Sequence, residues 1–301
     1  MMRPSWRGLA PFLLIFCLAS AARAAGPFSA VSGTIWFQGA CPEAAQKGRD
    51  VCAQDRVGTK GPATYLNVLK QAYPNLKPDG SAADSKKPRA EFGGFSGETG
   101  SGGSPLAKGE ILYFLKVQDG DSLRVLTLQE GTGLLAYVQV EPTLKLLDLV
   151  SIAQDQHVSL NADLGVIPVR AGEFVFLANN WHFNSSEAFN IYNLFLAGPE
   201  RVSLVYDGPF LYGFALPQRP ECRLGQRMMP LQALPTRHEG VSDLVFRVEE
   251  ERVCQGKDRE IVSGRRSFEG KLHWEKGKYM GGSRELHRLN HCRTEGKPGC
   301  G

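Results

Sequence analysis

Short apolar runs separated by turn residues fill the middle of the chain. Runs of strand length occupy residues 111–117, 122–128, 134–140, 145–152, 172–177, 189–196 and 201–206. Asp-Gly, Glu-Gly and Gly-Pro pairs separate them, and no long apolar stripe at a helical period competes. Because helices do not alternate with these strands, the pattern argues against a parallel α/β sheet. It predicts a mainly β fold, built as an antiparallel sandwich, barrel or propeller-like sheet.

The two ends of the chain add a few further elements. Residues 29–37 predict a strand, and apolar residues three and four apart predict a helix over 65–73. Thr64 is placed to cap this helix and Pro74 to end it. Near the C-terminus the pattern predicts two strands, then a short helix or strand, over residues 242–254, 266–274 and 284–291.

Changes in composition divide the chain into five parts. They are a signal peptide (1–24), an N-terminal element with one helix and a Cys41–Cys52 loop (25–77), a Gly/Ser-rich linker or long loop (78–109), a β-rich core (110–216) and a basic, cysteine-containing β segment packed on that core (217–301). The third part is expected to be a linker or loop because few of its side chains can bury apolar area.

The first residues have the pattern of an export signal. Arg3 and Arg7 precede an apolar stretch over 9–19, and Ala22-Arg23-Ala24 offers a cleavage site. This stretch is far shorter than the roughly 20 residues needed to span a bilayer. We therefore expect a periplasmic or secreted protein with no transmembrane segment in the mature chain.

Charge gives little support for a nucleic-acid partner. The 301 residues carry 35 Lys and Arg against 31 Asp and Glu, and three of the basic residues lie in the expected signal. Without them the balance is only +1, whereas a nucleic-acid binder is strongly basic. The basic residues concentrate after residue 216, with 17 Lys and Arg against 12 Asp and Glu.

The cysteines predict covalent cross-links. Cys17 lies in the expected signal, and six remain: Cys41, Cys52, Cys222, Cys254, Cys292 and Cys300. An even number in an oxidising compartment favours disulfides. Six cysteines allow fifteen pairings, among which the sequence alone does not choose. Short loops close at low entropic cost, so we expect Cys41–Cys52, Cys222–Cys254 and Cys292–Cys300.

The most unusual stretch is residues 179–187, which we expect to form a loop between two strands. It mixes amide, indole, imidazole and hydroxyl groups, and such loops often form binding sites. Trp181, His182, Phe183 and Asn184 are the candidate binding residues, with Trp181 or Phe183 stacking on a sugar or a protein partner. The alternative is a structural loop that packs its own aromatic rings into the core.

Two groups of residues suggest other chemistry. His157 and His182, with a carboxylate, could form a general acid/base site, and the candidate carboxylates are Asp148, Asp155 and Asp163. His287 and His291 would share one face of a helix next to Cys292, with Cys300 nearby, which suits zinc. We expect those thiols to be oxidised, however, and the sequence predicts no catalytic residue, metal or cofactor.

These observations favour an exported, non-catalytic binding protein. Its partner would be another protein or an envelope glycan. The first alternative is a hydrolase of envelope polymers that uses histidine and carboxylate groups. The second is a metal-binding accessory protein.

Overall fold

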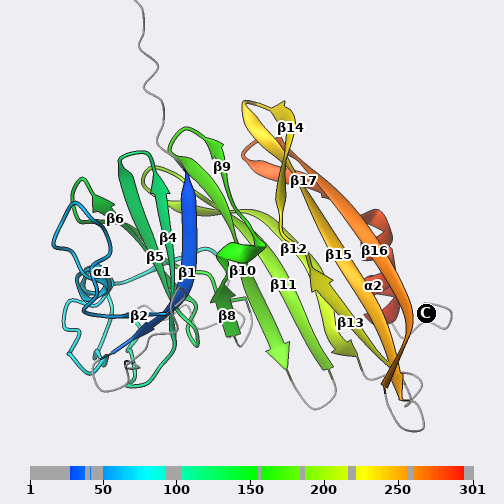
Figure 1. Ribbon diagram of the computed structural model, residues 1–301, viewed down its shortest axis with the longest axis horizontal. Coiled ribbons are helices and arrows are strands. Elements are labelled where there is room, and N and C mark those ends of the chain that lie inside the picture. Colours follow the sequence, from blue (N-terminus) through cyan, green and yellow to red (C-terminus); the bar gives the residue numbers. More distant parts are fainter. Residues whose placement is uncertain are drawn as a thin grey trace, which may run out of the picture.

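The computed structural model describes residues 28–37, 41, 50–92, 103–154, 157–183, 187–215, 222–255 and 260–294. The expected signal, Asp155, Asn184 and Cys300 lie outside these residues. The predicted mainly β architecture is confirmed: three sheets follow one another along the molecule, and two α-helices lie near its two ends (Figure 1). One of the sheets curves into a half-barrel.

The first sheet has seven strands in the order β2-β1-β4-β5-β6-β7-β3. Their bounds are β1 Ser29–Trp36, β2 Val51–Cys52, β3 Arg89–Ala90, β4 Leu112–Asp119, β5 Ser122–Gln129, β6 Leu134–Glu141 and β7 Lys145–Ser151. Helix α1 (Tyr65–Ala72) packs against it, and Thr64 caps the helix as predicted. β5 is buried almost throughout, because one face of the sheet meets α1 and the other meets the second sheet.

The second sheet lies in the middle and has the order β12-β11-β10-β8, with β9 pairing with β10. Its strands are β8 His157–Leu160, β9 Val166–Arg170, β10 Glu173–Phe183, β11 Glu187–Ala197 and β12 Val202–Ala215, and the 3-10 helix η1 (Ala162–Leu164) lies between β8 and β9. Alternation along β10 sends Phe174 and Phe176 toward the first sheet and Val175 and Leu177 toward the third. Both faces of this sheet are therefore core.

The third sheet has the order β13-β15-β16-β17, with β14 pairing with β15. Its elements are β13 Cys222–Met228, β14 Gln232–His238, β15 Val241–Gln255, β16 Glu260–Glu275 and β17 Lys278–Gly282, followed by helix α2 (Arg284–Thr294). Phe246, Leu272 and Trp274 fill its inner face, and Leu286 of α2 joins the same core. The segment expected as a short helix or strand is thus a helix.

Two side-chain clusters hold the first and second sheets together. Arg124, only 5% exposed, donates to the Tyr137 hydroxyl at 2.8 Å and to the carbonyl of Gly172 at 2.7 Å. At the sheet edges, Arg89 donates to Asp148 at 2.8 Å and to the carbonyl of Val202 at 2.6 Å. Asp148 in turn accepts the backbone N–H of Val202 at 2.9 Å.

Two of the expected disulfides are present. Cys41 bonds to Cys52, and Cys222 bonds to Cys254, its direct partner across β13 and β15. The expected Cys292–Cys300 pair lies outside what the structure describes, since Cys300 is not among those residues. The segment 78–109, expected as a linker or loop, contributes the short strand β3 and a bridge between the buried residues Ala82 and Leu106.

Two expectations about strand ends are wrong. The loop predicted over residues 179–187 is wrong for residues 179–183, which belong to β10. These residues have cross-strand partners on β11 as far as Phe183. The strand predicted over 201–206 continues to Ala215, because Asp207 and Gly208 form a bulge rather than a turn. Polar and glycine residues inside a strand cause both errors.

Candidate functional site

An open cleft of about 740 Å³ lies between β12 and α2. Its apolar lining is formed by Ile191, Tyr206, Pro209, Phe210, Phe246 and Leu286. Its polar lining is formed by Gln154, Asp207, Ser283, Arg284, His287, Asn290 and His291. The volume lies in the range of small-molecule sites, and such sites likewise combine apolar surface with polar groups.

A bulge in β12 shapes one wall of the cleft. Asp207 pairs with Asn193, and Phe210 pairs with Ile191, so three steps on β12 match two steps on β11. Gly208 absorbs the irregularity with a φ of 126°, a value that favours glycine. As a result Asp207 and Phe210 both line the cleft, although strict alternation would send residues three apart to opposite faces.

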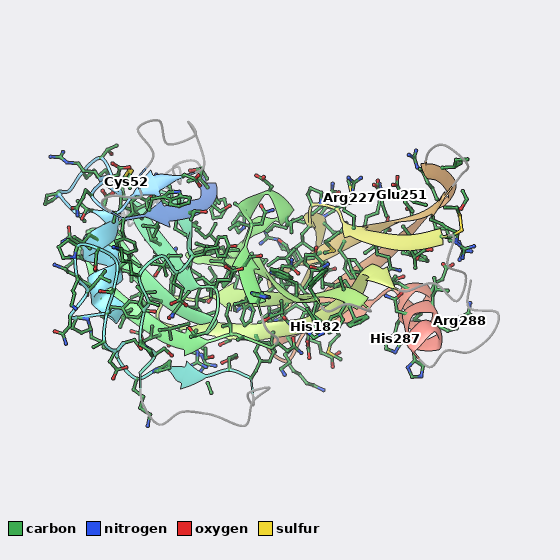
Figure 2. All side chains as sticks on the ribbon, turned by 90° about the horizontal axis from the view of Figure 1, so that it is seen from below. Cys52, His182, Arg227, Glu251, His287 and Arg288 are labelled. Atoms are coloured by element: carbon green, nitrogen blue, oxygen red, sulfur yellow. A yellow bond between two sulfur atoms is a disulfide. The ribbon has the colours of Figure 1, made fainter. Side chains whose placement is uncertain are left out.

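Helix α2 forms the other wall and is held there by polar contacts. The side-chain amide of Asn290, which is 5% exposed, donates to the carbonyl of Phe210 at 2.7 Å. It also contacts Gln226, which donates to Glu250 at 2.7 Å. This arrangement leaves Arg284, His287 and His291 as exposed residues along the cleft. Figure 2 shows this helix at the end of the molecule opposite Cys52.

A chain of buried amides ends at Asp207. The backbone N–H of Gln154 donates to Asn180 at 2.8 Å, and the Asn180 amide donates to Asn193 at 2.7 Å. Asn193 then donates to Oδ1 of Asp207 at 2.9 Å. Asn180 and Asn193 are both 0% exposed. Because buried amides are costly without partners, this chain keeps its members in place and fixes the exposed carboxylate of Asp207.

A row of rings crosses the face of the second sheet that also carries Asn180 and Asn193. His182 stacks on Phe189 with ring centroids 4.8 Å apart, and Phe189 lies 4.8 Å from Phe210. The row therefore connects the predicted residue His182 on β10 to a residue of the cleft wall on β12. Figure 2 shows His182 in the same half of the molecule as His287 of α2.

The other predicted binding residues lie elsewhere. Trp181 is adjacent to His182 in β10, so its side chain points to the opposite face of the sheet. There it stacks on His157, with ring centroids 4.2 Å apart. Phe183 is 58% exposed, and Asn184 lies outside the described residues. The structure thus brings His182 close to the cleft, through Phe189, and separates Trp181 from it.

The predicted acid/base residues do not gather. His157 and His182 lie on opposite faces of the second sheet, because His157 stacks on Trp181, which is adjacent to His182 in β10 and points to the other face. Nδ1 of His157 is 3.7 Å from Glu130. Asp148 is bound to Arg89 at the sheet edge, and Asp163 lies in the 3-10 helix η1. Asp155 is outside the described residues.

The structure is also informative about metal ligands and membrane segments. His287 and His291 have parallel rings with centroids 6.3 Å apart. Within the described ranges, no three His, Cys, Asp or Glu side chains gather in a way that could hold a metal ion. None of the helices in that part of the chain is both long and apolar enough to cross a membrane.

Comparison with known proteins gives no relative: no family model, curated protein or solved structure matches this chain. Sequence reasoning missed Asp207, which looked like the end of a strand. The available signal was the placement of Asp207-Gly208-Pro209 between two apolar runs, which is typical of a bulge as well as of a turn.

Proposed function

We propose that this protein is a non-catalytic binding protein and that the cleft between β12 and α2 receives the apolar part of its ligand. The observation that carries the proposal is the cleft itself, about 740 Å³ with three aromatic rings and several polar groups in its lining. Ligand sites of roughly 300–1,000 Å³ have this composition. A small amphipathic molecule, or a short apolar segment of a larger envelope component, fits such a space.

We further propose that the protein acts outside the cytosol, in the periplasm or as a secreted protein. The disulfides Cys41–Cys52 and Cys222–Cys254 support this, because disulfides persist in oxidising compartments. The signal-like residues at the start of the sequence agree with it. An envelope molecule is then the natural class of ligand.

Fluorescence of N-phenyl-1-naphthylamine, an uncharged apolar dye, tests the proposal. The native protein should enhance the fluorescence saturably, and Ile191→Glu should weaken binding at least about tenfold by placing a carboxylate on the cleft wall. Ile111→Glu is the matched control, because Ile111 is 43% exposed and lies just before β4 of the first sheet, outside the cleft lining. Ile191→Ala serves if the charged variant fails to fold. Equal binding by all variants would overturn the proposal.

A second candidate function is hydrolysis of an envelope polymer. The observation that favours it is the presence of Asp207, His287 and His291 in one cleft, since a carboxylate and an imidazole can share general acid/base work. Release of soluble fragments from purified cell-wall polymer tests it. Activity that is lost in both Asp207→Asn and His287→Gln would favour this candidate, and no release by the folded native protein would reject it.

A further inference from the structure

We propose that the cleft recognises an organic cation, an ammonium group carried on an apolar chain, with Asp207 as its counter-ion. The inference rests on the proposed binding function and adds the charge of the ligand's head group. Three rings, those of Tyr206, Phe210 and Phe246, line the cleft together with this carboxylate. Aromatic faces beside a carboxylate are the chemistry by which proteins bind ammonium ions.

The position of Asp207 is the first support. Its carboxylate accepts the 2.9 Å hydrogen bond from Asn193, which is itself held by Asn180. Two fully buried amides stabilise a fold less readily than apolar residues of the same size would. Their evident effect is to hold one carboxylate in one orientation at the cleft, and pre-oriented groups bind with a smaller entropic cost.

The aromatic wall is the second support. Burial raises the pKa of the Tyr206 hydroxyl, and the nearby charge of Asp207 raises it further. Tyr206 therefore remains uncharged beside the carboxylate over the physiological range. Phe210, which the bulge brings to the cleft together with Asp207, packs with Phe189 and is only half-buried, so part of its ring is open to a ligand. An ammonium group near Asp207 would meet ring surface, which attracts cations by about 0.5–2 kcal/mol per contact.

The opposite wall carries one fixed positive charge, that of Arg284, beside two imidazoles. Arg284, His287 and His291 lie on α2, and Arg284 is exposed to water. An arginine on the surface keeps much of its side-chain freedom, so holding it against an anion costs entropy. Asp207 has already been oriented by Asn193. We therefore place the ligand's cationic head group beside Asp207 on β12. Whether the protein prefers a cationic or an anionic head group tests this directly.

The experiment compares two amphiphiles with the same chain length. Dodecyltrimethylammonium and dodecanoate, each below its micellar concentration, compete with N-phenyl-1-naphthylamine for the native protein. The cation should displace the dye at a concentration about tenfold lower than the anion. Equal potency, or a stronger anion, would overturn the inference.

Variants then assign the preference to a residue. Asp207→Asn should abolish the difference between the two amphiphiles, because asparagine keeps an oxygen for Asn193 but lacks the charge. Asp121→Asn, on an exposed aspartate that is not part of the cleft lining, should keep the difference. A preference that survives Asp207→Asn, or that disappears in Arg284→Gln instead, would refute the assignment. If the native protein binds no dye at all, it is the proposed function that fails.

Discussion

Asn193 on β11 donates a 2.9 Å hydrogen bond to Asp207 on β12, across the bulge that opens the cleft. Asn193 is fully buried and Asp207 is exposed, so the bond connects the interior of the second sheet to the candidate site. This contact relates the stability of the fold to the orientation of the group that would bind a ligand.

Asn193→Leu should affect both properties. It leaves the buried amide of Asn180 without its acceptor, which should lower the free energy of unfolding by about 1–3 kcal/mol. It should also reduce the preference for dodecyltrimethylammonium over dodecanoate, because Asp207 loses its donor. Asn190→Leu, on the opposite face of β11, is the control and should keep the preference. A stable Asn193→Leu variant with an unchanged preference would show that the amide chain does not position Asp207.

The cluster around Arg89 should stabilise the contact between the first and second sheets. Asp148→Ala removes the acceptor of hydrogen bonds from both Arg89 and the backbone N–H of Val202. It should lower the free energy of unfolding, measured with urea, by about 1.5–3 kcal/mol. Asp121→Ala breaks an ion pair with Lys60 whose two side chains are 93% and 62% exposed, so no measurable change is expected. Similar losses in the two variants would argue against the structural role of Asp148.

Acid should destabilise the third sheet through Asp243. Burial raises the pKa of this carboxyl, but hydrogen bonds from Thr236 and His238 and the charge of His238 outweigh burial and leave it below its ordinary value of 3.8. A depressed folded-state pKa contributes stability above the unfolded value and loses it as the pH falls through the folded value. Between about pH 6 and pH 2, the native urea midpoint should therefore fall further than that of Asp243→Asn. Parallel curves for the two proteins would contradict this.

The two disulfides should differ in their effect on stability. Cys222–Cys254 closes a separation of 32 residues and Cys41–Cys52 one of 11. Loop entropy predicts that each double serine variant lowers the free energy of unfolding by about 2–4 kcal/mol, and that Cys222→Ser/Cys254→Ser lowers it more. Chemical unfolding of both variants measures the difference. The reverse order would mean that local packing, rather than loop length, decides their contributions.

The sequence predicted the strands whose residues alternate or are wholly apolar, such as β5 and β6. It missed β13 and β14, because CRLGQRM and QALPTRH are polar and contain glycine or proline. Their strand conformation comes from pairing with β15, and the residues of β13 and β14 themselves carry no apolar alternation that would show it.

The candidate site was harder to predict for the same reason. His182 was selected for its unusual neighbours, but its connection to Phe210 depends on the register of three strands. Trp181 was selected with it, yet a strand sends adjacent side chains to opposite faces. Asp207 and His287 are 80 residues apart in the sequence, and only the folded third sheet places them on one cleft.

Hydrogen–deuterium exchange with and without dodecyltrimethylammonium tests the central claim most directly, because it locates the ligand as well as detecting it. We predict slower exchange in residues 206–211 of β12 and 284–291 of α2, with little change in the first sheet. Protection confined to other parts of the protein, at a concentration where the amphiphile is bound, would contradict the assignment of the cleft as the binding site.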